Sequence, residues 1–128
     1  KGLSPEAAAQ TANITNTKLC WENVFQTLAM AHEAGVDIVV TYVACDGYFT
    51  KEDFERLAKL LQPYPNITLK INNCYLEERI DYRRKGLPKD EIAMMVQEFV
   101  EAHEEYKGRT VLFKDHDSCL DESKITLY

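Results

Sequence analysis

Acidic and amide side chains follow three apolar segments of this sequence, at the points where those segments end. The segments cover residues 36–44, 67–71 and 110–113. If they form parallel strands, their carboxyl ends meet at one edge of a sheet, which is where open α/β sheets bind ligands. That edge would collect the side chains of Asp46, Tyr48, Asn72, Asn73, Lys114, Asp115, His116 and Asp117.

The chemistry of such an edge depends on its three aspartates. Carboxylate oxygens are the ligands that Mg²⁺ takes in proteins, and a nearby lysine can offset the charge of a phosphate. We therefore expect Asp46, Asp115 and Asp117 to bind the metal if this edge holds one. This expectation follows from the predicted topology rather than from a contiguous metal-binding motif.

The order of these groups resembles the layout of the Toprim domain of primases, topoisomerases and related nucleases. In that layout one strand ends in an acid followed by Gly, and a later strand ends in Asp-x-Asp. Here Asp46-Gly47 and Asp115-His116-Asp117 stand in those places, within residues 36–117. The resemblance implies a divalent-metal-dependent phosphoryl-transfer or nuclease activity. The chain departs from the family at Asp46, where the family has Glu, and at Ser118, where a Gly usually stands.

The basic side chains of residues 75–85 form the main basic cluster of the sequence, on a segment that we predict to be a short helix. A solvated helix face is one explanation of the cluster, and contact with a phosphate or an acidic partner is the other. Nucleic-acid binding is expected only here, because broad binding to phosphates needs a basic field and the net charge is −6. The candidate binding residues of this segment are Tyr75, Arg79, Arg83 and Arg84, with Lys85 beside them.

The three apolar segments alternate with helical patterns. Segment 36–44 is almost wholly β-branched or aromatic, which favours a strand covered on both faces. Thr50 and Asp53 predict a capping box for a helix that ends before Pro63, with Phe54, Leu57, Ala58 and Leu61 on its apolar face. Strand, helix and strand with short connections predict a right-handed βαβ unit.

Two further helices flank this unit. The first covers 18–34, with Trp21, Val24, Phe25, Leu28 and Ala31 on one side, and the second runs from Pro88 to about Tyr106. We predict an N-terminal arm over 1–17 with a short helix, and a single α/β domain over 18–128. The predicted fold is a three-layer sandwich with a small, mostly parallel sheet, helices on both faces and a C-terminal edge strand over 125–128. A ferredoxin-like or other α+β arrangement is the alternative.

One internal similarity is visible. Ala31-His32-Glu33-Ala34-Gly35 precedes the first strand, and Ala102-His103-Glu104 precedes the third. A duplicated αβ unit is one interpretation, and the repeated use of the same helix-ending chemistry is the other. Both histidines are expected to lie at helix ends or in the core rather than to bind a metal.

Composition limits the function classes. The chain has 128 residues and lacks any apolar run near the roughly 20 residues of a transmembrane helix, so we expect a soluble protein. Four cysteines without a C-x-x-C pair predict reduced thiols and a cytoplasmic protein. Two Asn-x-Thr sequons, at Asn13 and Asn66, leave secretion as the alternative.

The sequence carries no G-x-S-x-G, Walker, G-x-G-x-x-G or H-E-x-x-H motif. We therefore expect a small acidic, non-catalytic binding or regulatory protein: an inhibitor, an immunity-type protein or an adaptor. Its partner would be a protein with a basic surface, contacted by acidic side chains and by Tyr48, Tyr64, Tyr75 and Tyr82. No cofactor is expected for this function. The alternative is the metal-dependent phosphoryl-transfer or nuclease domain, with Mg²⁺ as cofactor.

Overall fold

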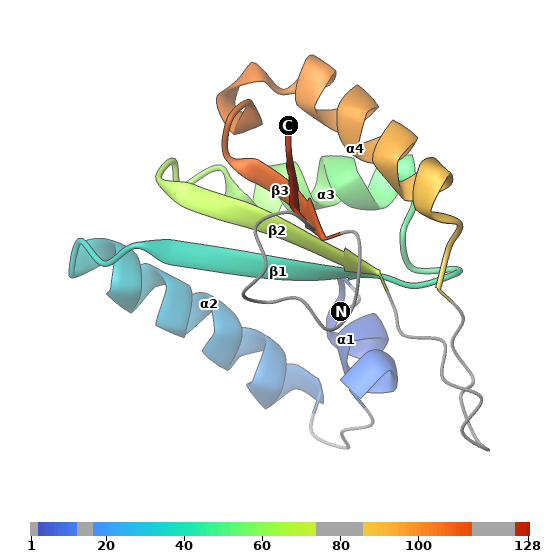
Figure 1. The fold of residues 1–128 in the computed structure, drawn as a ribbon. Coiled ribbons are helices and arrows are strands. Elements are labelled where there is room, and N and C mark those ends of the chain that lie inside the picture. The colour runs from blue at the N-terminus through green and yellow to red at the C-terminus, as the bar shows by residue number, and fades with distance from the viewer. Residues whose placement is uncertain (1–2, 13–16, 74–85, 114–124) are drawn as a thin grey trace.

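The computed structural model describes residues 3–12, 17–73, 86–113 and 125–128, and it has a mixed α/β fold (Figure 1). Helices and strands alternate through the middle of the chain, as the sequence predicts. In order, the elements are α1 (Pro5–Ala12), α2 (Thr17–Glu33), β1 (Ile38–Ala44), α3 (Lys51–Leu61), β2 (Ile67–Asn73), α4 (Lys89–Ala102), the 3₁₀ turn η1 (Glu104–Tyr106), β3 (Thr110–Phe113) and β4 (Ile125–Leu127).

The four strands form one sheet in the order β1-β2-β3-β4. β1 is parallel to β2, with Ile38 beside Ile67 and Ala44 beside Asn73. β2 is parallel to β3, and β4 pairs with β3 in the antiparallel direction. The prediction of three parallel strands and a C-terminal edge strand is therefore confirmed.

The predicted capping box starts α3. The Thr50 hydroxyl accepts a hydrogen bond from the Asp53 N–H at 3.2 Å, and the Asp53 carboxylate accepts one from the Thr50 N–H at 3.1 Å. These bonds satisfy two of the donors that a helix start leaves open. The apolar face of α3 then buries Phe54, Leu57, Ala58 and Leu61, as its spacing predicts.

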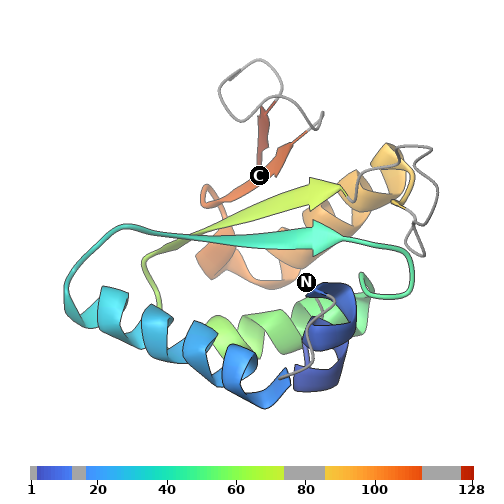
Figure 2. The ribbon, with the colours of Figure 1, turned by 90° about the horizontal axis from the view of Figure 1, so that it is seen from below.

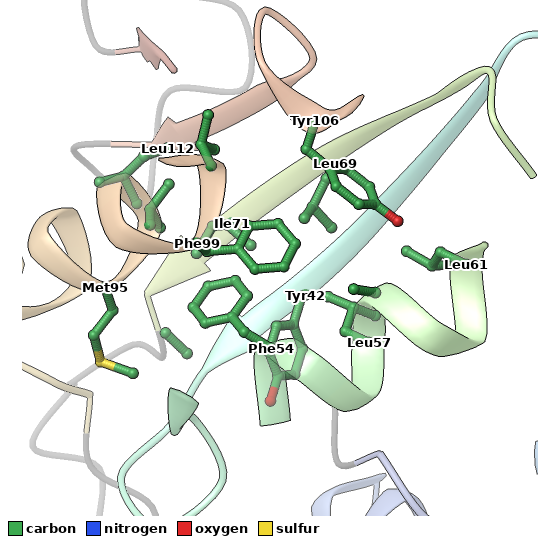
Figure 3. Packing of buried hydrophobic residues seen from close by; sticks show 14 of the residues in the cluster. Tyr42, Phe54, Leu57, Leu61, Leu69, Ile71, Met95, Phe99, Tyr106 and Leu112 are labelled. Carbon is green, nitrogen blue, oxygen red and sulfur yellow. The ribbon is translucent and has the colours of Figure 1, made fainter. Parts of the chain in front are cut away.

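Aromatic rings join α3 to α4 across the core. The Phe54 and Phe99 rings stack with their centroids 4.6 Å apart, and Figure 3 shows them facing one another between the two helices. Tyr106 lies 5.1 Å from Phe99 on the far side of this pair. Beneath the rings, the sheet contributes Tyr42, Leu69, Ile71 and Leu112, all nearly inaccessible to solvent.

The helices of the described chain lie on one side of the sheet, so helices on both faces are not confirmed. Figure 2 shows α1, α2 and α3 on the same side of β1, and α4 joins the same core. On the other side, Val39 is 60% exposed and Thr41 is exposed. The uninterrupted apolar run suggested a doubly covered strand, but β-branched residues also suit a half-exposed strand.

Two helices differ from the predicted boundaries or burial. α4 ends at Ala102, because the backbone of His103 (φ −130°, ψ 79°) leaves the helical region, and a 3₁₀ turn follows. On α2, Leu28 is buried as expected, but Val24 is 60% exposed. Val24 lies at the margin of the apolar stripe of α2, which the core covers only along its centre.

Candidate functional site

The carboxyl ends of β1 and β2 lie side by side, as the predicted site requires. Val43 is beside Asn72 and Ala44 is beside Asn73, so the turn after β1 and the two asparagines share one edge of the sheet. β3 runs in the same direction. Of the predicted site residues, Asp46 and Tyr48 therefore follow the end of β1, and Asn72 and Asn73 close β2 at the same edge of the sheet.

The remaining predicted site residues lie outside the described part of the chain. They are Lys114, Asp115, His116 and Asp117 after β3, and Tyr75, Arg79, Arg83, Arg84 and Lys85 in the basic segment. Within residues 3–12, 17–73, 86–113 and 125–128, no group of three His, Cys, Asp or Glu side chains could hold a metal ion. The metal site at Asp46, Asp115 and Asp117 thus stays a prediction.

Asn73 holds the chain together at this edge. Its side-chain amide donates to the Leu87 carbonyl oxygen at 2.9 Å, and its side-chain oxygen accepts from the Leu87 N–H at 3.1 Å. These two bonds fix the segment that leads into α4 against the end of β2. The Asn73 side chain is therefore occupied by a structural role.

Asn72 differs from its neighbour. Its side-chain oxygen Oδ1 is buried and, among the residues that the structure describes, has no hydrogen-bond partner. Alternation along β2 directs it to the opposite face of the sheet from Asn73, together with Thr68 and Lys70. Asn72 is thus the one of the two asparagines whose side chain keeps an unused acceptor.

The turn after β1 is fixed from the core side. The Tyr48 N–H donates to the Cys45 carbonyl oxygen at 3.0 Å, and Gly47 takes the left-handed conformation at φ +77°. From below, the Tyr42 hydroxyl donates to the Tyr48 carbonyl oxygen at 2.5 Å. Asp46 is exposed at the tip of the turn, so its carboxylate is open to solvent.

The same contact perturbs Tyr42. Burial raises the pKa of the Tyr42 phenol well above its ordinary value, and the negative charge of Asp53 adds to this effect. The phenol therefore stays protonated and serves as a hydrogen-bond donor to the turn. It braces the turn and does not act as a base at neutral pH.

A second group of polar side chains surrounds His103, at the end of α4. Its Nε2 lies 3.0 Å from a carboxylate oxygen of Glu55, and its Nδ1 lies 3.6 Å from one of Glu105. Its ring also packs against Phe99 at 4.9 Å. These contacts confirm the prediction that His103 is a helix-end histidine against the core.

The open face of the sheet is the surface that the sequence analysis missed. We use this name for the side opposite the helices, where partnered residues of all four strands project. Val39 and Leu127 are 60% and 62% exposed, and the residues between them are partly exposed. Its described members are Val39, Thr41, Val43, Thr68, Lys70, Asn72, Val111 and Leu127. The alternation Ile67-Thr68-Leu69-Lys70-Ile71-Asn72 was the available signal for it.

The paired strands β1 and β2 also share a short sequence pattern. Each residue of β1 is paired with the residue 29 positions later, since 67 − 38 = 29 and 73 − 44 = 29. The same offset relates Cys45 to Cys74. Val40-x-Tyr42-x-x-Cys45 thus corresponds to Leu69-x-Ile71-x-x-Cys74. The similarity covers only β1 and β2, because the offset from β2 to β3 is 41 residues (110 − 69 = 41). It is separate from the His-Glu similarity, which relates the segments before the first and third strands, and both interpretations of that similarity stay open.

Comparison with known proteins gives no relative: no protein-family model, curated protein or solved structure matches this chain. Among the residues that the structure describes, no helix is both long enough and apolar enough to cross a bilayer.

Proposed function

We propose that this chain is a non-catalytic binding protein, of the adaptor or inhibitor kind, whose open face contacts a protein partner with a basic surface. The observation that carries the proposal is the exposure of apolar side chains on that face. Val39 and Leu127, from the two outer strands, are each more than half exposed although both belong to the sheet. Contiguous exposed apolar patches are typical of interaction sites, and on this face the partly exposed Val111 lies directly beside Leu127.

The winding of the sheet supports a face rather than a pocket as the contact surface. Ligand crevices in open α/β sheets form where the strand order reverses and helices switch faces. From β1 to β3 the strands follow one another without such a reversal. Among the described strands, the order therefore provides no such reversal for a small-ligand crevice.

The sequence pattern that β1 and β2 share supports the same proposal. The spacing apolar-x-apolar-x-x-Cys at a 29-residue offset resembles the consensus of leucine-rich repeats, in which each unit adds one strand and one helix. Repeat proteins that stack such units use the extended surface formed by the stack to bind partners. A protein partner on the strand side of this sheet fits that general behaviour.

The net charge indicates the kind of partner. The chain has 21 acidic and 15 basic residues. The helical layer on the opposite side of the sheet from the open face also carries exposed acidic residues, among them Glu91, Glu101 and Glu104. A negative field accelerates encounter with a basic partner and repels acidic ones. Apolar contacts on the open face would then hold the complex after this encounter.

The experiment uses lysine substitutions with a matched control. Val39→Lys and Leu127→Lys place a charge on the open face, and Val24→Lys adds the same charge on α2 at the same 60% exposure as Val39. Immobilised proteins are incubated with a lysate of the native host, and retained proteins are identified by mass spectrometry. The affinity of the purified partner for each variant is then measured at two salt concentrations.

We expect a basic protein that binds the wild type and Val24→Lys alike, and that binds each open-face variant about tenfold or more weakly, the loss typical of an interface anchor. Binding should also weaken at higher salt because the charges are screened. Equal binding by all three variants, or an acidic partner, would contradict the proposal.

The metal-dependent phosphoryl-transfer domain is the second candidate, and the parallel direction of β1, β2 and β3 is the observation that favours it. Its test compares Asp46→Asn with Asp37→Asn, which removes an exposed carboxylate at the opposite end of β1. Under the binding proposal, millimolar Mg²⁺ or Mn²⁺ leaves the melting temperature unchanged. A metal-induced rise that disappears only in Asp46→Asn would support the second candidate.

A further inference from the structure

The outer edge of β1 has the properties of a site for pairing with another strand. β1 is the first strand of the sheet and, among the described residues, pairs only with β2. Figure 2 looks toward this edge and shows α1, α2 and α3 to one side of it rather than across it. Alternate N–H and C=O groups of an edge strand point away from the sheet and can pair with a further strand.

The sequence of β1 contains none of the features that usually prevent such pairing. Natural edge strands are short or carry Pro, Lys, inward charges or bulges. β1 runs for seven residues, IVVTYVA, without Pro, Gly or a charged side chain. At the other edge, β4 has only three residues. β1 is therefore the longer and less protected of the two edges.

We propose that the outer edge of β1 pairs with the same edge of a second copy of this chain. In an antiparallel arrangement centred on Thr41, the residue at the middle of the strand, Thr41 lies opposite its own counterpart. Val39 then lies opposite the partner's Val43, and Val40 lies opposite the partner's Tyr42. In this two-fold arrangement, apolar residues of β1 lie opposite apolar residues, threonine lies opposite threonine, and no charged side chains are opposed.

Directly opposed residues of antiparallel strands lie on the same face of a sheet. Pairing through β1 therefore joins the open faces of two copies into one surface, with both helical layers on the other side. The exposed side chain of Val39 gains an apolar neighbour in this arrangement. No new backbone conformation is needed, because β1 is already extended and paired along its inner edge.

Charge makes this association distinguishable from the proposed function. Each copy carries a net charge of −6, so two copies repel one another and added salt strengthens their association. Binding of a basic partner responds to salt in the opposite direction. Val39 takes part in both proposed contacts, whereas Leu127 lies at the far edge of the sheet, so Leu127→Lys tests partner binding without altering the β1 edge.

The test is a charge swap at Thr41, an exposed position. Sedimentation equilibrium is measured for the wild type, Thr41→Asp and Thr41→Lys, and for an equimolar mixture of the two variants. Thr68→Asp, on the neighbouring inner strand, is the control for a charge added to the same face. Circular dichroism confirms that each variant retains its fold.

We expect the wild type and Thr68→Asp to form dimers, increasingly so at higher salt. Each Thr41 variant alone should dimerise at least tenfold more weakly, because like charges lie directly opposite one another. Their mixture should recover a heterodimer. A monomeric wild type at all concentrations and salt levels would overturn the proposal, as would dimers unaffected by Thr41 charges or a mixture that stays monomeric.

Discussion

Replacing Asn73 should destabilise the fold, because this side chain is a structural link rather than a ligand-binding group. Asn73→Ala removes the hydrogen bonds of 2.9 and 3.1 Å to the two peptide groups of Leu87. Each bond contributes about 1 kcal/mol, and the half-buried groups left unpaired add to the loss, so we expect about 2–3 kcal/mol in total. At roughly 4 °C per kcal/mol for a chain of this size, the melting temperature should fall by about 8–12 °C.

Asn72→Ala is the matched control, one residue earlier on the same strand. Among the described residues its Oδ1 atom is buried without a hydrogen-bond donor, which carries a desolvation cost, so we expect removal of this side chain to leave the free energy of unfolding undiminished or to raise it. Urea denaturation followed by circular dichroism measures both variants, with an unchanged slope required for the comparison. Equal losses at the two positions, or a larger loss at Asn72, would refute the structural role assigned to Asn73.

Three further substitutions test the core and its edges. Phe54→Ala removes a ring that packs against aromatic neighbours at 4.6–6.1 Å and should cost about 3–5 kcal/mol in urea unfolding, whereas Met94→Ala, exposed on α4, should cost little. Tyr42→Phe should reduce the loss of stability at alkaline pH. Because the pKa of the Tyr42 phenol is raised in the folded state, its contribution to stability is fully present below about pH 10 and is lost above it by up to about 1.4 kcal/mol per pH unit. The free energy of unfolding, measured from pH 8 to 11, should therefore fall less steeply with pH in the variant than in the wild type. Arg109→Lys should lower the melting temperature measurably, because the Arg109 guanidinium donates to more than one backbone carbonyl oxygen, one of them at 2.8 Å, and an ammonium group cannot reproduce this fork. The control Lys107→Met should leave the melting temperature nearly unchanged.

Local chemistry made several elements predictable from sequence. The Thr50 and Asp53 pair specifies the start of α3 because each group satisfies the other within one turn of helix. The parallel strands follow from apolar segments joined through a helix, since such connections form βαβ units. Both depend on residues close together in the chain, and such interactions are visible in a sequence.

The roles of Asn72 and Asn73 were not predictable in the same way. Both asparagines close the same strand, and a sequence gives no reason to separate them. Asn73 is used structurally because Leu87, 14 residues later, returns to the same edge. That return depends on how α4 docks on the core, which is a tertiary contact. A candidate binding residue can thus prove structural once its long-range partner is known.

Strand order explains why the helices share one face and why β1 is left open. Right-handed crossovers that always advance in the same direction place every connecting helix on the same side of a sheet. The order β1-β2-β3 is such an advance, and α3 and α4 accordingly share one core. Handedness can be expected from sequence, whereas the direction of each advance cannot. A single direction leaves one face free of the helices of the described residues and makes the first strand an outer edge, so the open face and the β1 edge have the same structural origin.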